Sequence, residues 1–293
     1  MLNARNVATV LAVLFLALSF AALPGVDAGP VQTAASDLIY VPVMVTDNKN
    51  VPVATLKEAD FQVLEDNKEQ KVTYFSGAGE PLTLTVVLGL SARGPVKSPG
   101  QRDRTTVDIL NSVEAIRAAS NAPQVEQIPL DADSMFTVLA KAMDNLSKQP
   151  SPRKALVVVS DGFISSGMQP NNAPLPKALI ESSKTASFPV HFLTVVPSLP
   201  APSFQEGTEY STGYYLQQIS EFSGGEVLTG QIDNDLTRIS TNLRDGLKNQ
   251  YVLGYKSPNA AKDGKWRKIT VKVNPSAGKF KLLTRDRYFV PKG

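Results

Sequence analysis

The sequence predicts a mixed α/β fold in which a doubly wound, mostly parallel sheet lies between two β-rich segments. Short, continuous apolar runs in the middle of the chain, 155–159 and 190–196, are typical of strands buried on both faces of a parallel sheet. Helical segments alternate with these runs, as they do in doubly wound sheets. Towards both ends of the chain, strands instead alternate apolar and polar residues, as half-buried antiparallel strands do.

The elements are expected in the following order. The first strands are expected at 38–45, 61–65 and 71–75. The central segment is expected to contain strand 82–88, helices 105–119 and 134–146, strand 155–159, helix 174–185, strand 190–196, helix 213–222, strand 227–228 and helix 234–248. The last strands are expected at 251–255, 266–273, 280–283 and 287–290. Gly224 and Gly225 are a typical helix stop, and Asp263-Gly264 predicts the turn of a hairpin.

The two β-rich ends are expected to fold together. Neither end has enough strands for a stable core by itself, so we expect one immunoglobulin-like β-sandwich built from residues 37–79 and 250–293. Residues 80–249 then form an α/β domain inserted into this sandwich. The length of 293 residues is compatible with two domains.

The N-terminus predicts export. Arg5 precedes an apolar run from Val7 to Leu23, and Pro24-Gly25 and small residues follow it up to Ala28. This pattern predicts a secretory signal peptide over residues 1–28 and a linker over 29–36. The alternative is a retained membrane anchor, for which the run is a little short. We therefore expect a periplasmic or secreted protein without a stable membrane span after cleavage.

Composition excludes several classes of function. The chain has no cysteine, which excludes disulfides, thiol catalysis and cysteine-ligated metals. Its 30 basic and 27 acidic residues give a net charge of +3, which is too even to indicate nucleic-acid binding. Neither the dinucleotide-binding motif Gly-x-Gly-x-x-Gly after a strand nor the P-loop motif Gly-x-x-x-x-Gly-Lys-Ser/Thr is present.

Several stretches of the chain, taken in order, carry a family resemblance: Val41–Asp47, Asp60–Asp66, Arg153–Gly162, Gly224-Gly225, Gln250–Tyr255 and Gly264–Arg267. They resemble the von Willebrand factor A-related proteins of acidobacteria. The resemblance covers roughly residues 37–290, and the joint order of the stretches makes it specific. It implies a von Willebrand factor A-like domain with a non-catalytic role in binding a protein partner.

The resemblance also implies a metal-ion-dependent adhesion site, which is incomplete here. In this family an Asp-x-Ser-x-Ser motif, a later Thr and an Asp after another strand hold Mg²⁺ through oxygen ligands. Gly89 stands at the motif's Asp position, Ser91 at its first Ser and Arg93 at its second Ser. Asp161 keeps the last ligand position, while Asp133 and Ser134 lie in the Thr region without clear alignment.

We therefore predict a degenerate binding site that works without a metal or other cofactor. Arg93 would repel Mg²⁺, and Ser91 and Asp161 alone cannot hold the ion against water. Only a contribution from Asp133 would restore Mg²⁺ binding. Arg93 itself either pairs with Asp161, receives an acidic group of the partner, or is an ordinary surface arginine.

Two other classes of function remain open. Ser91, Asp161 and His191 follow the order of a hydrolase triad. Against this, Arg93 stands where the nucleophile turn needs a small residue, and His191 falls within an expected buried strand. The second alternative is a structural subunit of a cell-envelope assembly.

An aromatic cluster precedes and enters the helix expected at 213–222. It consists of Phe204, Tyr210, Tyr214 and Tyr215. Such residues either anchor a partner or pack back on the helix.

Overall fold

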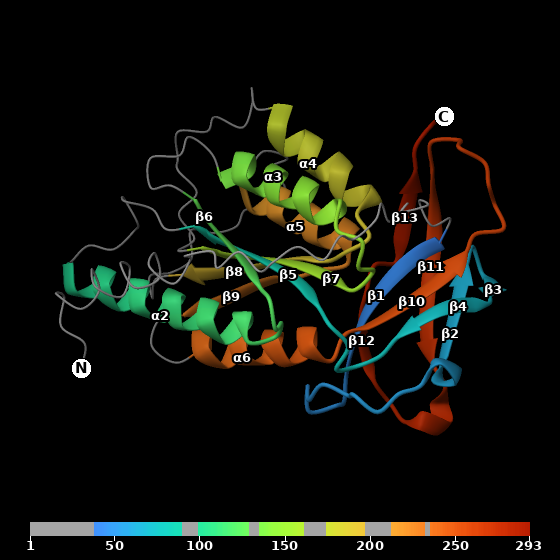
Figure 1. Ribbon diagram of the computed structural model, residues 1–293, viewed down its shortest axis with the longest axis horizontal. Helices are drawn as coiled ribbons and strands as arrows, with labels where there is room; N and C mark the ends of the chain where they lie inside the picture. Colours follow the sequence, from blue (N-terminus) through green and yellow to red (C-terminus); the bar gives the residue numbers. More distant parts are fainter. Residues whose placement is uncertain (1–37, 90–98, 129–134, 161–173, 197–211, 232–234) are drawn as a thin grey trace, which may run out of the picture. The chain divides into compact units, whose positions relative to one another are not determined.

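The computed structural model describes residues 38–89, 99–128, 135–160, 174–196, 212–231 and 235–293. These residues belong to one compact unit, Asp37–Gly293. They form a five-stranded parallel sheet with helices and two four-stranded antiparallel sheets (Figure 1). The predicted mixed α/β fold with a parallel sheet is therefore confirmed.

The parallel sheet occupies the middle of the chain. Its strands, in spatial order, are β6 (Gln124–Ile128), β5 (Thr83–Gly89), β7 (Lys154–Ser160), β8 (Val190–Val196) and β9 (Val227–Gln231). Every neighbouring pair in this sheet is parallel. The sequence does not predict β6, because its Gln-Val-Glu-Gln-Ile sequence is mostly polar. An edge strand pairs on one side only, so it can form without a continuous apolar run.

Helices cover both faces of this sheet. Figure 1 shows α2 (Pro99–Arg117) and α6 (Asp235–Lys248) on one face and α3 (Met135–Ser147), α4 (Pro174–Thr185) and α5 (Thr212–Ser223) on the other. Val157 and Val159 of β7 belong to the core under α2 and α6, whereas Leu156 and Val158 belong to the core under α3, α4 and α5. This explains why β7 is apolar at every position between its ends.

The two antiparallel sheets are built from both ends of the described chain. One has the order β12 (Lys281–Leu283), β1 (Leu38–Thr46), β10 (Tyr251–Lys256) and β4 (Val72–Ser76). The other has the order β13 (Arg287–Val290), β11 (Lys265–Val273), β2 (Phe61–Glu65) and β3 (Lys68–Gln70). Val43 and Leu253 of the first sheet share a core with Val63 and Ile269 of the second. The immunoglobulin-like topology and the domain boundaries stay predictions.

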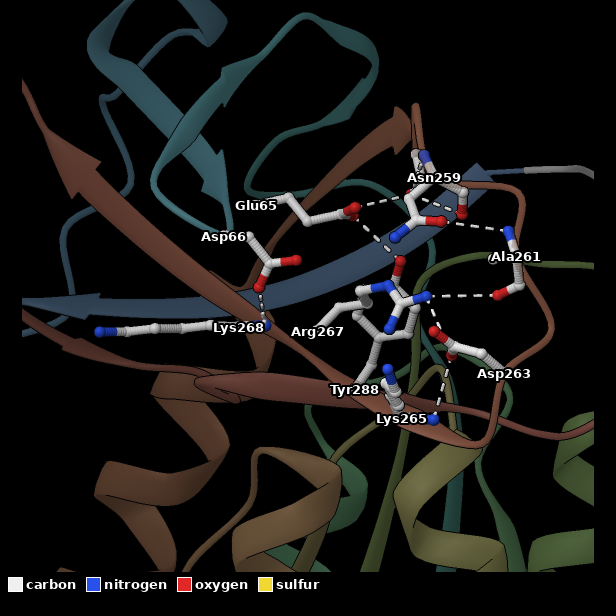
Figure 2. Close-up of polar contacts among 10 residues, drawn as sticks. Glu65, Asp66, Asn259, Ala261, Asp263, Lys265, Arg267, Lys268 and Tyr288 are labelled. Atoms are coloured by element: carbon white, nitrogen blue, oxygen red, sulfur yellow. Dashed lines mark hydrogen bonds and ion pairs between the residues drawn. The ribbon is translucent and has the colours of Figure 1, made fainter.

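The hairpin predicted at Asp263-Gly264 is wrong. β10 pairs with β1 and β4, whereas β11 pairs with β2 and β13, so the connection between them crosses from one sheet to the other. Gly264 does adopt a φ of +70°, as a turn residue can. Arg267 fixes this connection by donating to the Ala261 carbonyl and the Asp263 carboxylate (Figure 2). The turn residues thus account for the bend at Gly264, whereas burial of alternate side chains determines which strands β10 and β11 pair with.

The predicted signal peptide and linker lie outside the described residues, so they stay predictions. Among the described helices, none is long and apolar enough to cross a membrane.

Candidate functional site

The carboxyl ends of the parallel strands meet at one edge of the sheet. Gly89, the last residue of β5, is level with Ser160 at the end of β7 and with Ile128 at the end of β6. The five predicted site residues, Ser91, Arg93, Asp133, Ser134 and Asp161, lie outside the described residues. Ser91 follows Gly89 by two positions and Asp161 directly follows Ser160. The two strands that lead to them therefore end side by side.

A row of hydroxyl groups lies at this edge. Ser160, Thr194 and Thr229 are in register across β7, β8 and β9. The hydroxyl oxygens of Thr194 and Thr229 lie 3.3 Å apart. Ser160 is buried and Thr229 is exposed, so the row runs from the middle of the sheet to its margin. The sequence alone does not predict this row, because only the strand register shows that the three residues are level.

His191 lies away from the carboxyl edge. It is level with Val157, three residues before Ser160, and its side chain is completely buried. No described group hydrogen-bonds to either of its ring nitrogens, and Glu226 Oε1 lies 4.0 Å from Nδ1. Burial lowers the pKa of His191 to about 4, and burial raises the pKa of Glu226. His191 is therefore a neutral side chain at neutral pH.

We expect His191 to make the protein less stable in acid. Between pH 6.5 and about 4 the unfolded chain binds a proton at this position while the folded protein does not, so stability falls as pH drops through this window. The loss should reach about 3 kcal/mol at the lower end. Urea unfolding of the protein and of His191→Leu at pH 7 and pH 4.5 measures this difference. An equal acid loss in both proteins would contradict the buried, neutral histidine.

The core between the two antiparallel sheets contains a buried carboxylate. Glu65 is only 3% exposed and accepts hydrogen bonds from the hydroxyls of Tyr255 (2.8 Å), Tyr288 (3.0 Å) and Ser257 (2.7 Å). The Glu65–Tyr288 pair is visible in Figure 2. Burial and the nearby carboxylate raise the pKa of Tyr288 to about 12. Because three hydroxyl donors satisfy both oxygens of Glu65, its arrangement fits a structural network better than a reactive group.

The aromatic cluster divides into two parts. Tyr215 is 3% exposed and packs edge-on against Phe136, with ring centroids 6.1 Å apart. Tyr214 is 38% exposed on the outside of α5. Phe204 and Tyr210 lie outside the described residues. Tyr215 therefore packs into the core against Phe136 of α3 and not back on its own helix, while Tyr214 remains at the surface.

Among the described residues, no three His, Asp or Glu side chains are grouped so that they could hold a metal ion. This does not bear on the predicted adhesion-site remnant, which lies outside them.

Comparison with known proteins gives limited similarity. No family model matches the chain, and no curated protein sequence matches it. Among solved structures, it is similar to the conserved hypothetical protein BatB from Bacteroides thetaiotaomicron, with 14% identity and a TM-score of 0.33 over 57% of this chain and 100% of that one. It is also similar to the human COPII-coat protein Sec24c, with 10% identity and a TM-score of 0.31 over 73% of this chain and 44% of that one.

Proposed function

We propose that this protein is an exported, non-catalytic protein-binding module with a von Willebrand factor A-like domain and an immunoglobulin-like sandwich. In this proposal it binds its partner at the carboxyl edge of the parallel sheet without a metal ion. The support for the family comes from the ordered sequence stretches together with a parallel sheet covered by helices on both faces.

The observation that carries the proposal is the residue at the end of β5. Gly89 is level with Ser160 at the edge where the adhesion motif requires its aspartate. Glycine has no side chain, so this position offers no carboxylate oxygen to a metal. Mg²⁺ needs hard oxygen ligands in near-octahedral order, and Arg93 adds a positive charge to the same motif. Metal-independent binding is therefore the function that these residues favour.

The position of His191 favours binding over hydrolysis. A general base must reach the nucleophile's proton directly or through one water molecule. His191 is buried three residues before the level of Ser160, a rise of about 10 Å along a strand. A serine hydrolase built on Ser91, Asp161 and His191 is the second candidate, and release of product from ester substrates, lost in Ser91→Ala, would establish it.

The proposed function is tested by partner capture. Residues 29–293, the predicted mature chain, are immobilised and exposed to envelope extract with Mg²⁺ or with EDTA. We expect the same saturable, stoichiometric partner in both conditions, and loss of capture in EDTA would restore the metal-dependent adhesion mechanism. If Arg93 receives an acidic group of the partner, Arg93→Ala should weaken capture about tenfold, while the control Arg117→Ala should not. Unchanged capture by Arg93→Ala would exclude that role of Arg93.

A further inference from the structure

The outer edge of β9 presents backbone groups that no described strand pairs with. β9 lies at one end of the parallel sheet, next to β8 alone. The N–H of Phe192 in β8 donates to the carbonyl of Glu226 at 2.9 Å. In a strand, successive residues direct their N–H and C=O groups to opposite sides. Leu228 therefore faces β8, whereas the N–H and C=O groups of Val227 and Thr229 face outward.

This edge lacks the features that usually prevent a strand from pairing with another chain. Natural edge strands carry charged residues, proline or bulges. Among the described edge strands, β3, β6, β12 and β13 each contain at least one charged residue. β9 reads Val-Leu-Thr-Gly-Gln, without a charge or a proline. β4 also has no charged residue, but β9 differs from β4 because two pockets flank its beginning.

Two pockets flank the beginning of β9. A pocket of about 340 Å³ lies on the α6 side and includes Leu228, and a pocket of about 320 Å³ on the α5 side includes Val227. Both pockets are lined by Glu226 and by Leu283 of β12. Side chains of a strand alternate between its faces, so a strand added beside β9 would direct alternate side chains to the two sides.

The two pockets favour different side chains. The pocket on the α6 side has walls of Met44, Leu228, Ile239, Leu243, Leu282 and Leu283. Its charged groups already have neighbours: Arg238 pairs with Asp235 at 3.2 Å, Lys281 donates to Asn50 at 2.9 Å, and Oε1 of Glu226 lies 4.0 Å from Nδ1 of the buried His191. This pocket therefore suits an apolar side chain.

The pocket on the α5 side is acidic. It is lined by Glu221 and Asp286, and the two carboxylates share one cation, Arg287. Arg287 lies 2.7 Å from Glu221 and 3.4 Å from Asp286. Two carboxylates and one guanidinium leave a net negative charge, which suits a lysine or arginine side chain.

We propose that β9 is a docking edge for an extended segment of a partner protein, in which apolar and basic residues alternate. The segment adds to the sheet as a strand beside β9, using the outward groups of Val227 and Thr229. Its apolar residues enter the pocket on the α6 side and its basic residues contact Glu221 and Asp286. This inference rests on the proposed protein-binding function, but it concerns a surface separate from the carboxyl edge.

A peptide of ten residues in which valine alternates with lysine serves as the probe. Amide hydrogen exchange of the protein is measured by NMR with and without the peptide. We expect the amide of Thr229 to exchange at least tenfold more slowly at saturating peptide, because a free edge N–H becomes hydrogen-bonded. The amide of Leu228, which already faces β8, should change much less. A peptide that alternates valine with glutamate should have no such effect.

A matched pair of variants separates backbone pairing from side-chain contact. Thr229→Pro removes the outward N–H without removing a bond to β8, whereas Thr229→Val keeps that N–H. Both lose the contact with Thr194, so that contact cancels between them. We expect Thr229→Val to bind the peptide as the wild type does and Thr229→Pro to bind about tenfold more weakly. Far-UV circular dichroism checks that both variants are folded, and the exchange measurement on the wild type needs neither variant.

Three results would overturn the inference. They are unchanged exchange at Thr229 with saturating peptide, equal binding by Thr229→Pro and Thr229→Val, and a wild-type dimer that Thr229→Pro converts to a monomer. The last result would mean that a second copy of this chain occupies the edge. The partner-capture experiment is independent, because it concerns the carboxyl edge. Captured partner with no effect of Thr229→Pro would leave the proposed function standing and remove only the β9 edge.

Discussion

Replacing Gly225 by alanine is expected to lower the free energy of unfolding by about 4 kcal/mol. An added Cβ would lie 2.0 Å from the carbonyl oxygen of Val190 and 2.5 Å from its carbonyl carbon. Both are main-chain atoms, and β8 is hydrogen-bonded to β7 on one side and to β9 on the other. β8 therefore cannot move away from the added Cβ without breaking its hydrogen bonds to β7 or to β9. The same carbonyl also accepts a bond from the Ser220 hydroxyl at 3.0 Å, which the shift would disrupt.

The control for this prediction is Gly79→Ala. Gly79 has a φ of +87°, but an added Cβ there would meet nothing within 4 Å. Backbone strain alone should cost about 1 kcal/mol at this position. Urea unfolding followed by fluorescence of Trp266, the one tryptophan of the chain, measures both variants. Equal midpoints for Gly225→Ala and the wild type would show that the close approach to Val190 is not rigid.

The sequence predicts the interior of this fold better than its margins. Continuous apolar runs identify β7 and β8, because both faces of these strands are covered by helices. β3 and β6 are missed because they are short, polar edge strands. The connection at Asp263-Gly264 is misread for a related reason: a turn motif describes four residues, whereas pairing depends on strands distant in the chain.

The candidate site is predicted only as far as the sequence motif reaches. Gly89 at the end of β5 is identified by its spacing to Ser91 and Arg93. The hydroxyl row and the outward edge of β9 depend on strand register, which no single segment encodes. Buried charges are missed for the same reason. Arg153 is noted in the sequence only as the first residue of a stretch that carries the family resemblance, yet it is 2% exposed.

Removing the guanidinium of Arg153 is the second change expected to cost about 4 kcal/mol. Its Nη2 donates to the carbonyls of Leu247 (3.1 Å) and Lys248 (2.6 Å), and its Nε donates to that of Gln250 (3.1 Å). Its Nη1 donates to the carbonyl of Glu80. Glu80 lies in the connection before β5, Gln250 lies in the connection between α6 and β10, and Leu247 and Lys248 are the last two residues of α6. The Arg153 side chain therefore links both connections.

The physical reason for the cost is that the carbonyls have few other donors. The last carbonyls of α6 have no partner within the helix, and a cation at this end also interacts favourably with the helix dipole. Burial lowers the pKa of Arg153, but a guanidinium remains charged in proteins, so the buried charge depends on these bonds. Arg153→Met keeps most of the apolar stem and removes the guanidinium donor from all four carbonyls. Those of Leu247 and Lys248 keep only the main-chain N–H groups of Gln250 at 3.3 Å and of Gly79 at 3.5 Å.

Two further variants make the measurement specific. Arg153→Lys keeps the charge, but its single ammonium group cannot span both connections, so we expect a loss of about 2 kcal/mol. Arg117→Met removes an arginine whose side chain is 32% exposed and whose ion pair with Glu114 lies within one helix, and it should cost at most about 0.5 kcal/mol. We expect the urea midpoint to be lowest for Arg153→Met, higher for Arg153→Lys and highest for Arg117→Met. These variants leave successively fewer of the four carbonyls without the donor that Arg153 supplies. Equal urea midpoints for Arg153→Met and Arg117→Met would mean that water replaces the guanidinium. The two connections would then be held in place by the packing around them.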